Sequence, residues 1–448
     1  TPRRWILQAN PAMSSIFTSV LGPGWVNDLR RLKTLGPFAT DPSFQRQWSD
    51  AKLANKKRLA GWIAENLSVD VMTDAIFDMQ VKRIHEYKRQ LMNVLSIVHR
   101  YAVIASSSAR DRARITPRVC ILAGKAAPGY DVAKKIIQLA CGVAKVVNND
   151  VRCAGRLQVV FIPNFNVSLA ELIIPASDIS QHISTAGMEA SGTGNMKFVM
   201  NGGLIVGTRD GANIEIAREV GEENLFSFGA TANEVAALRA SMRTRAPSTD
   251  ERLARVIRMI RSGVFGDPED SAALMDALDP RRDYYLVGHD FPSYLEALDR
   301  ADLAYANRRG WAAKTIRAAS NMWAFSSDRT IKEYAEKVWN MRPAPFKPPH
   351  HVASPSPSKP NGGRAEYLHG AGGSRTNVGS SRAACSESLR SSAKIAASTA
   401  SRTSSITARK TPGGHWSRSA PSVNRAPASA PTPPRVTTTG GASGRSRR

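Results

Sequence analysis

Cysteine is scarce in this chain, with four residues among 448. They stand at positions 120, 141, 153 and 385 and form neither a Cys-x-x-Cys pair nor a zinc-like spacing with histidine. We therefore expect no disulfide framework and no metal site, and the pattern is typical of reduced thiols in the cytoplasm. An apolar run of about 18 residues is also missing, which argues against a membrane-spanning helix.

An initiator methionine and a signal peptide are missing as well. The first residues, TPRRWILQANPAM, have a short basic start but no long apolar core. We therefore expect a cytoplasmic protein whose chain is a fragment or has lost its start.

Acidic residues are few, with 37 Asp and Glu against 62 Lys and Arg. Residues 343–448 hold 16 of these basic residues and only two acids, and Ser, Pro, Ala, Arg, Gly and Thr dominate the segment. Such a composition cannot bury enough apolar surface to offset chain entropy, so we expect a disordered basic tail. Nucleic-acid binding by this tail rests on charge alone and is disfavoured, because Tyr367 and Trp416 are its only large rings after Phe346.

Residues 1–70 have a helical pattern. Asn10 followed by Pro11 predicts a helix start and Gly22 a stop. The charged run Lys56–Lys57–Arg58 is interpreted as the solvent-facing side of a longer helix.

Residues 71–342 alternate between strand-like and helix-like segments. Apolar β-rich runs at 77–81, 118–126, 156–164, 204–216 and 223–230 predict strands. The segments 82–105, 130–149 and 168–184 are predicted to be helical, with the last expected to break at Pro175. This alternation predicts an α/β fold with a doubly wound, Rossmann-like and mostly parallel sheet, with ligands at the carboxyl ends of its strands.

The stretch Glu189–Lys197, EASGTGNMK, combines flexible residues with one lysine. Gly192 and Gly194 bracket Thr193, and a helix is predicted from about Asn195. Glycines ahead of a helix start expose backbone N–H groups that can hold a phosphate. A lysine on the first helical turn is typical of a pyridoxal phosphate site, although the spacing alone leaves an ordinary loop open.

A second cluster, VKRIHEYKRQ, follows the run FDMQV and places five basic residues at a predicted helix start: Lys82, Arg83, His85, Lys88 and Arg89. The positive end of a helix dipole disfavours cations unless an anion is bound. A solvated face is the alternative, but Ile84 and Tyr87 suggest partial burial, so we predict a phosphate site. His85 is read as a structural, hydrogen-bonding histidine.

Four long segments resemble the C-terminal half of glycogen/starch (α-glucan) phosphorylases, with a similarity that runs from Thr1 to about Arg342: FDMQVKRIHEYKRQLMN, GKAAPGYDVAKKII, VSLAELIIPASDIS and STAGMEASGTGNMKFVMNGGLIVGTRDGANIEI. The resemblance implies a retaining phosphorolysis of α-1,4-glucan by inorganic phosphate to give glucose 1-phosphate. It implies the C-terminal domain of a two-domain GT-B glycosyltransferase, with residues 1–70 at the domain junction and 71–342 as the catalytic domain. A homodimer is implied for the full-length family.

The resemblance also implies roles for individual residues. Pyridoxal 5′-phosphate would be held as a Schiff base on Lys197, with cofactor contacts from Lys82, Gly192, Thr193, Gly194, Phe165 and Trp5. The catalytic and substrate-phosphate residues would be Arg83, Lys88 and Tyr87, and the sugar would contact Glu189, Ser191 and Gly192. For Trp5, ordinary interdomain packing is equally open. Asp210, Asn213 and Glu215 are expected to shape a turn and a buried polar network.

Several features depart from the family pattern. Its N-terminal half, which supplies the other wall of the cleft, is not present, so we expect little or no phosphorylase activity from this chain alone. The alternative is a non-catalytic cofactor- or glucan-binding remnant. Phe165 stands where the family often has tyrosine, and Arg209 where it usually has an apolar residue, so a buried arginine in need of a partner is expected there.

Overall fold

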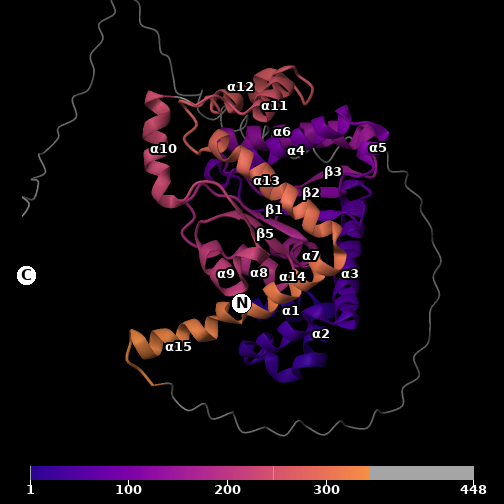
Figure 1. The fold of residues 1–448 in the computed structure, drawn as a ribbon, viewed down its shortest axis with the longest axis vertical. Helices are drawn as coiled ribbons and strands as arrows, with labels where there is room; N and C mark the ends of the chain where they lie inside the picture. The colour runs from indigo at the N-terminus through magenta and orange to yellow at the C-terminus, as the bar shows by residue number, and fades with distance from the viewer. Residues whose placement is uncertain (1, 246, 343–448) are drawn as a thin grey trace, which may run out of the picture. The chain divides into compact units, whose positions relative to one another are not determined.

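The computed structural model describes residues 2–245 and 247–342, so the tail predicted for 343–448 lies outside the described residues. A six-stranded parallel sheet stands at the centre of the described residues, in the order β3-β2-β1-β4-β5-β6 (Figure 1). Its strands are β1 (Ile76–Val81), β2 (Arg118–Ala123), β3 (Leu157–Ile162), β4 (Ile179–His182), β5 (Leu204–Thr208) and β6 (Phe226–Phe228). The predicted doubly wound parallel sheet is confirmed.

Helices cover both faces of the sheet, as expected for strands that are apolar on both sides. On one face Phe77, Val119 and Val160 pack against α3 (Pro42–Leu67) and α7 (Val167–Ala176). On the other, Ile76, Cys120 and Val159 belong to the cluster formed with α4 (Gln90–Ser106), α6 (Asp131–Asn149) and α13 (Val287–Ala306).

Shorter elements complete the described part of the chain. The helices are α1 (Pro2–Leu7), α2 (Pro11–Leu21), α5 (Ala109–Arg112), α8 (Gly194–Met200), α9 (Ala212–Val220), α10 (Ala232–Thr244), α11 (Glu251–Arg261), α12 (Pro268–Asp276), α14 (Arg308–Ser320) and α15 (Ser327–Lys337). The 3₁₀ turns are η1 (Pro23–Val26), η2 (Leu29–Thr40), η3 (Glu86–Lys88), η4 (Val151–Cys153), η5 (Glu222–Asn224) and η6 (Asn321–Phe325).

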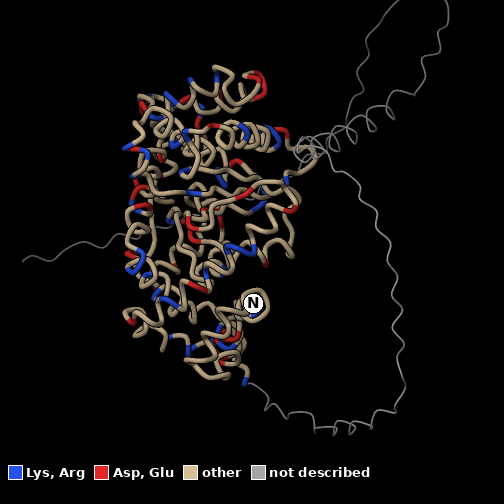
Figure 2. The backbone as a smooth tube through the Cα atoms, turned by 90° about the vertical axis from the view of Figure 1, so that its right-hand side faces the viewer, with Lys and Arg blue, Asp and Glu red and all other residues tan. Residues whose placement is uncertain are grey.

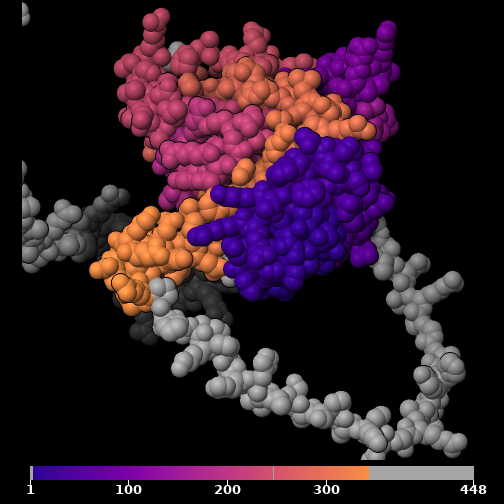
Figure 3. All heavy atoms as spheres, turned by 60° about the horizontal axis from the view of Figure 1, so that its bottom comes forward, coloured from indigo at the N-terminus to yellow at the C-terminus, as the bar shows by residue number. Residues whose placement is uncertain are grey.

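The N-terminal segment packs beside elements from the far end of the described chain. Figure 3 shows residues near the N-terminus (indigo) next to the last helices (orange), and η2 lies against α14 and η6. The predicted cap is confirmed, because the side chain of Asn10 accepts a hydrogen bond from the N–H of Met13. The same side chain donates to Asn201 at the end of α8.

The predicted helix 82–105 begins too early. Residues 82–85 continue alongside β2 after β1 ends: the N–H of Lys82 donates to Ala123 and that of Ile84 to Lys125. The α-helix starts only at Gln90, after a left-handed Arg89 with φ of 54°. The basic cluster therefore lies in a strand-to-helix loop.

Two other element assignments were wrong. The segment 168–184 contains α7 and also β4, which escaped detection because its polar side chains Ser180, Gln181 and His182 are buried but hydrogen-bonded. The predicted strand 204–216 ends at Thr208, and its second half forms α9. The turn between them is made by Gly211, whose φ is 50°.

Lys56 does not face solvent as predicted. Its ammonium group is buried and forms an ion pair with Asp178 at 2.6 Å. On the same helix, the buried ammonium group of Lys52 donates to the backbone carbonyls of Pro175, Ser177 and Asn201. Long amphipathic side chains reach buried acceptors in this way, and the sequence pattern does not reveal it.

Charged residues of both signs are interspersed over the described backbone (Figure 2). Within the described residues, no helix is both long enough and apolar enough to cross a membrane.

Candidate functional site

A cavity of about 680 Å³ opens where the strand order reverses, between β1 and β4. Ligands of doubly wound folds bind at this switch point, outside the carboxyl ends of the strands. The loop after β1 and the loop after β4 supply most of its charged residues. The predicted site residues that line it are Trp5, Lys82, Arg83, Lys88, Phe165, Glu189, Ser191, Gly192, Thr193, Gly194 and Lys197.

Gly124 allows the loop after β1 to lie against the loop after β2. A Cβ atom at this position would stand 2.3 Å from the carbonyl oxygen of Lys82 and 2.7 Å from the side chain of Ile84. Such contacts are far below van der Waals distance, so a side chain cannot be accommodated without a shift of the loop. The glycine therefore helps to set the position from which Lys82 and Arg83 enter the cavity.

Lys82 lies beside a buried histidine that sequence reasoning did not single out. The Lys82 Nζ is 3.4 Å from the Nδ1 of His182, and the Nε2 of the same ring is 2.7 Å from the hydroxyl of Ser180. Burial and the charges of Lys82 and Lys88 hold the pKa of His182 well below its ordinary value, so the ring is neutral. Burial and the nearby charge of Lys88 also lower the pKa of Lys82 to about 8.

Lys88 and Glu189 form an ion pair across the cavity. The hydroxyl of Tyr87 donates to the same carboxylate at 3.2 Å, and the Lys88 ammonium lies 4.4 Å from the centre of the Tyr87 ring. Although burial raises the pKa of Glu189, the hydrogen bond and charge of Lys88 bring it below its ordinary value. Tyr87, predicted as a catalytic residue, does not line the cavity itself, but its hydroxyl bonds the carboxylate of Glu189, which does.

Asp210 holds the loop that carries Glu189. Its buried carboxylate accepts hydrogen bonds from the Ser184 hydroxyl at 2.7 Å and from the N–H groups of Gly187 at 2.8 Å and Glu189 at 2.9 Å. Asn213 joins the neighbouring segments, because it bonds the carbonyl of His182 and the side chain of Asn195. The predicted polar network is confirmed for Asp210 and Asn213.

Two predictions near this network were wrong. Glu215 is exposed on α9 and takes no part in the network. Arg209 is exposed as well, with 59% of its side-chain surface accessible, and lies 3.8 Å from Glu222. A surface arginine of this kind needs no buried partner.

Lys197 lies on α8 as predicted, but it is the fourth of the seven residues of this helix and belongs to its last turn rather than its first. Its Nζ lies 4.6 Å from the centre of the Trp5 ring, and Phe165 forms part of the cavity wall. Burial lowers the pKa of Lys197, which increases the fraction of the neutral, nucleophilic amine.

Several donors of the cavity have no partner among the described residues. These are the side chains of Arg83, Lys125 and Lys197, for which no hydrogen bond or ion pair occurs in that part of the chain, and the backbone N–H groups of Gly192 and Thr193. Gly192 adopts a φ of 77°, a conformation that favours glycine. Cations and free amides gathered in one cavity are suited to binding more than one phosphate.

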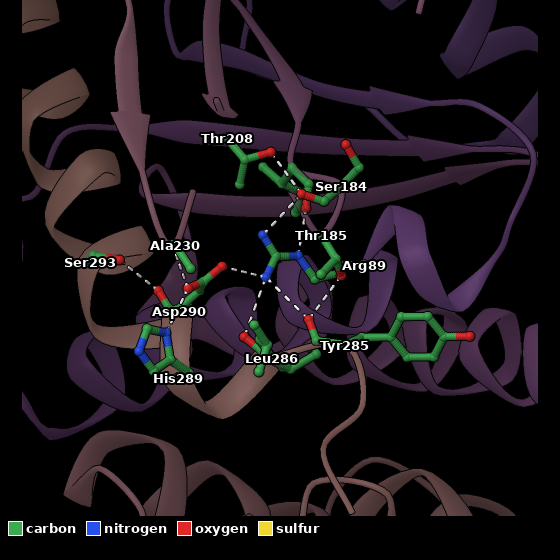
Figure 4. A network of polar contacts seen from close by, with 12 residues as sticks. Arg89, Ser184, Thr185, Thr208, Ala230, Tyr285, Leu286, His289, Asp290 and Ser293 are labelled. Atoms are coloured by element: carbon green, nitrogen blue, oxygen red, sulfur yellow. Dashed lines mark hydrogen bonds and ion pairs between the residues drawn. The ribbon is translucent and has the colours of Figure 1, made fainter. Parts of the chain in front are cut away.

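Arg89 ties this region to the interior. Its guanidinium is fully buried and contacts Asp290 at 2.6 Å, with further hydrogen bonds to the carbonyls of Ile183, Ser184, Tyr285 and Leu286 (Figure 4). Although burial raises the pKa of Asp290, His289 and Arg89 hold it below its ordinary value. Arg89 thus joins the loop after β1, the loop after β4 and the start of α13.

His85 has the structural role expected of it, although it does not lie on a helix. Its Nδ1 accepts from the N–H of Tyr87 at 3.4 Å, and its ring packs between those of Tyr87 and Tyr130. Among the described residues, no cluster of three or more His, Cys, Asp or Glu side chains could hold a metal ion.

The sequence model of the family described as carbohydrate phosphorylase matches residues 1–341. This chain belongs to the carbohydrate phosphorylase family. A Solanum tuberosum protein named "Alpha-glucan phosphorylase, H isozyme" is 48% identical over 347 residues, which are 76% of this chain and 41% of that protein. "Alpha-glucan phosphorylase 2, cytosolic" of Arabidopsis thaliana is 47% identical over 351 residues, 77% of this chain and 42% of that protein.

"Glycogen phosphorylase 2" of Dictyostelium discoideum is 48% identical over 350 residues, 77% of this chain and 35% of that protein. The chain therefore spans about two fifths of the length of the carbohydrate phosphorylases that it matches.

Sequence reasoning missed His182 and Lys125 as cavity residues of this carbohydrate phosphorylase chain. His182 could have been found from a strand assignment for 179–182, since the residue at the carboxyl end of a buried strand faces the ligand edge. Lys125 falls at the end of the predicted strand 118–126, and its position in the cavity depends on the packing of two loops.

Proposed function

We propose that the chain forms the cofactor- and phosphate-binding part of an α-1,4-glucan phosphorylase, which converts α-1,4-glucan and inorganic phosphate into glucose 1-phosphate with retention. The observation that carries the proposal is the cavity at the sheet's switch point, where Lys197 shares one space with Lys82, Arg83 and Lys88. Location in the cytoplasm, a homodimer in the full-length protein and a domain boundary near residue 70 remain predictions.

The residues present fit pyridoxal 5′-phosphate. Lys197 has a lowered pKa and no hydrogen-bond or ion-pair partner among the described residues, as an amine that attaches to an aldehyde requires. The cofactor phosphate would be held by the free amides of Gly192 and Thr193 and by the ammonium of Lys82. Gly194, the next residue, is the first residue of α8. Trp5 and Phe165 supply apolar surface for the ring.

Arg83 and Lys88 would bind the substrate phosphate, and Glu189, Ser191 and the Gly192 backbone would contact the glucosyl unit. When bound, the cofactor supplies a second phosphate group that can exchange a proton with the substrate phosphate. Two phosphates repel each other unless cations separate or surround them. The side chains of Lys82, Arg83 and Lys88 provide that positive charge, and His182 stays neutral beside Lys82.

The proposal is tested by incubating the purified chain with pyridoxal phosphate and reducing it with borohydride. We expect a stable mass increase that peptide mapping assigns to Lys197, and a near-ultraviolet absorbance before reduction. Failure to retain the cofactor contradicts the proposal. Retention without glucose 1-phosphate formation, even after an N-terminal half from a relative is supplied, supports the cofactor-binding remnant instead.

Glu189 competes with phosphate for Lys88. We expect Glu189→Gln to tighten binding of inorganic phosphate to the cofactor-loaded chain by about fivefold, or ~1 kcal/mol, because the amide leaves the ammonium without its carboxylate partner. Isothermal titration calorimetry measures the change. Glu86→Gln is the matched control, since Glu86 bonds Tyr130 away from the cavity. Equal phosphate affinity in Glu189→Gln and the unsubstituted chain contradicts the assigned phosphate site.

Phosphate affinity should fall as the pH rises from 7 to 9. The lowered pKa of Lys82, about 8, means that its ammonium is mostly charged at the lower pH and mostly neutral at the higher. Inorganic phosphate gains negative charge over the same pH range, which by itself would strengthen binding. The fall in phosphate affinity would therefore come from the loss of positive charge on Lys82. Titrations of the cofactor-free chain with inorganic phosphate at each pH measure it, because the pKa of about 8 belongs to a Lys82 that has no cofactor phosphate beside it. Lys82→Met should bind weakly without this pH dependence.

A further inference from the structure

The side chain of His182, at the end of β4, has a polar neighbour at each of its two ring nitrogens. β4 runs beside β1 at the switch point, where Met79 is paired with Ser180, so His182 lies beside the loop that carries Lys82. Alternate residues of a strand point to the same face of the sheet, and Ser180 and His182 are two positions apart. The ring therefore stands between the Ser180 hydroxyl on its own strand and the Lys82 ammonium on the neighbouring loop.

The ring of His182 has little freedom to turn away from these two neighbours. The residue is only 8% exposed, and the ring of Phe198 packs against it at an angle of 67°, with 6.1 Å between ring centres. A Cβ atom at Gly194 would stand 3.5 Å from its Cε1. The backbone is held as well, because the His182 carbonyl accepts from the side chain of Asn213 at 3.1 Å. The two ring nitrogens thus have fixed directions.

The chemistry of the two neighbours determines which nitrogen carries the proton. An ammonium group can only donate, so the Nδ1 of His182, 3.4 Å from the Lys82 Nζ, has to be the acceptor. A neutral ring then carries its proton on Nε2 and donates it to the Ser180 hydroxyl at 2.7 Å. Burial and the positive charges of Lys82 and Lys88 hold the pKa of His182 well below its ordinary value. These charges disfavour a cationic ring, which would point a second proton at Lys82.

An accepting nitrogen at this place restricts where the Lys82 ammonium can point. Lysine has a flexible stem and three rotatable donors, and one of them is directed to Nδ1 while the other two remain for the cavity. We propose that His182 is a positioning residue of the phosphate site: its neutral ring, protonated on Nε2 and held by Ser180, keeps the ammonium of Lys82 directed at a bound phosphate. The role of Lys82 toward the cofactor phosphate rests on the proposed function, whereas its contact with His182 does not.

The test uses the purified full chain before any cofactor is added, with inorganic phosphate as the probe in calorimetry. His182→Leu should weaken phosphate binding at pH 7 about fivefold, because Lys82 loses its direction and a hydrogen bond that favours its charged form. The pH at which phosphate affinity falls, set by the Lys82 pKa of about 8, should move down by about one pH unit. Lys88 and Glu189, whose charges also act on Lys82, are unchanged in this variant.

His182→Gln is the conservative variant, because its amide oxygen can accept from Lys82 while its NH₂ group donates to Ser180. It should bring phosphate affinity to within about twofold of the unsubstituted chain and restore the pH profile, which leucine, a residue that only fills the space, should not do. His99→Leu is the matched control, since His99 is a half-buried histidine on α4 that does not line this cavity. Circular dichroism confirms that each variant is folded.

Nitrogen NMR of the unsubstituted chain with isotope-labelled histidine reads the tautomer directly and does not depend on the folding of His182→Leu. At pH 7, the ring signals that disappear in His182→Gln should be those of a neutral ring with its proton on Nε2. A proton on Nδ1 or a cationic ring overturns the proposal. A folded His182→Leu with unchanged phosphate affinity and an unchanged pH profile overturns it as well.

Borohydride reduction with pyridoxal phosphate, which marks Lys197, separates this proposal from the proposed function. A chain that attaches the cofactor but shows neither the tautomer nor the shifted phosphate profile contradicts the role of His182 alone. A chain that shows both but does not attach the cofactor supports the role of His182 and contradicts the proposed function.

Discussion

Lys197→Ala is expected to lose all pyridoxal phosphate that survives borohydride reduction and gel filtration. The substitution removes the amine of α8 that lies against the Trp5 ring in the cavity. Without a covalent bond the cofactor would be held only by polar contacts to its phosphate and by packing of its ring against Trp5 and Phe165. The retained cofactor is measured by absorbance and by intact mass.

Lys125→Ala is the matched control, because Lys125 lines the same cavity on a different loop. It should retain the cofactor at the level of the unsubstituted chain. Arg83→Ala should also retain it while losing phosphate binding, because Arg83 is placed for the substrate phosphate. Cofactor attached to another lysine in Lys197→Ala, at full stoichiometry, would refute the assignment.

Replacing Arg89 should lower the free energy of unfolding more than any of the other substitutions predicted above. Arg89→Met leaves the carboxylate of Asp290 buried without its cation, and the carbonyls of Ile183 and Ser184 without a donor. Removing one partner of a buried ion pair costs about 3–5 kcal/mol. Urea denaturation followed by tryptophan fluorescence measures the change in the free energy of unfolding.

The double variant Arg89→Met/Asp290→Asn separates charge from packing. It should recover part of the lost stability, because the uncompensated charge is gone even though the carbonyls remain unpaired. A single variant within 1 kcal/mol of the unsubstituted chain would show that water or another cation reaches Asp290.

The parallel sheet and most of the cavity could be predicted because their signals are local. Apolar runs such as VCILA and FDMQV indicate buried strands, and the glycines and lysine of EASGTGNMK lie within nine residues. These segments fall at the carboxyl ends of neighbouring strands, where parallel topology brings them together.

Other features depend on partners distant in sequence. β4 was missed because the polar residues of this buried strand are satisfied by other parts of the chain, as Gln181 is by Asp78. Lys56 was read as solvent-facing because its partner, Asp178, lies far along the chain. The helix start at Gln90 was misplaced because Arg89 adopts a left-handed conformation, stabilised by contacts to residues 183–184 and 285–290.

The contacts of Lys52 have a consequence for dissecting the protein. The ammonium of Lys52, on α3, donates hydrogen bonds to backbone carbonyls at the carboxyl-terminal ends of α7 and α8. These are the carbonyls of Pro175, Ser177 and Asn201. Helix ends of this kind need donors and favour positive charge. An expression clone that starts at residue 71 would lack α3 and its Lys52, and would leave these three carbonyls without their donor. We expect it to yield insoluble or partly unfolded material, so the first 70 residues should be kept in any shortened version of this protein.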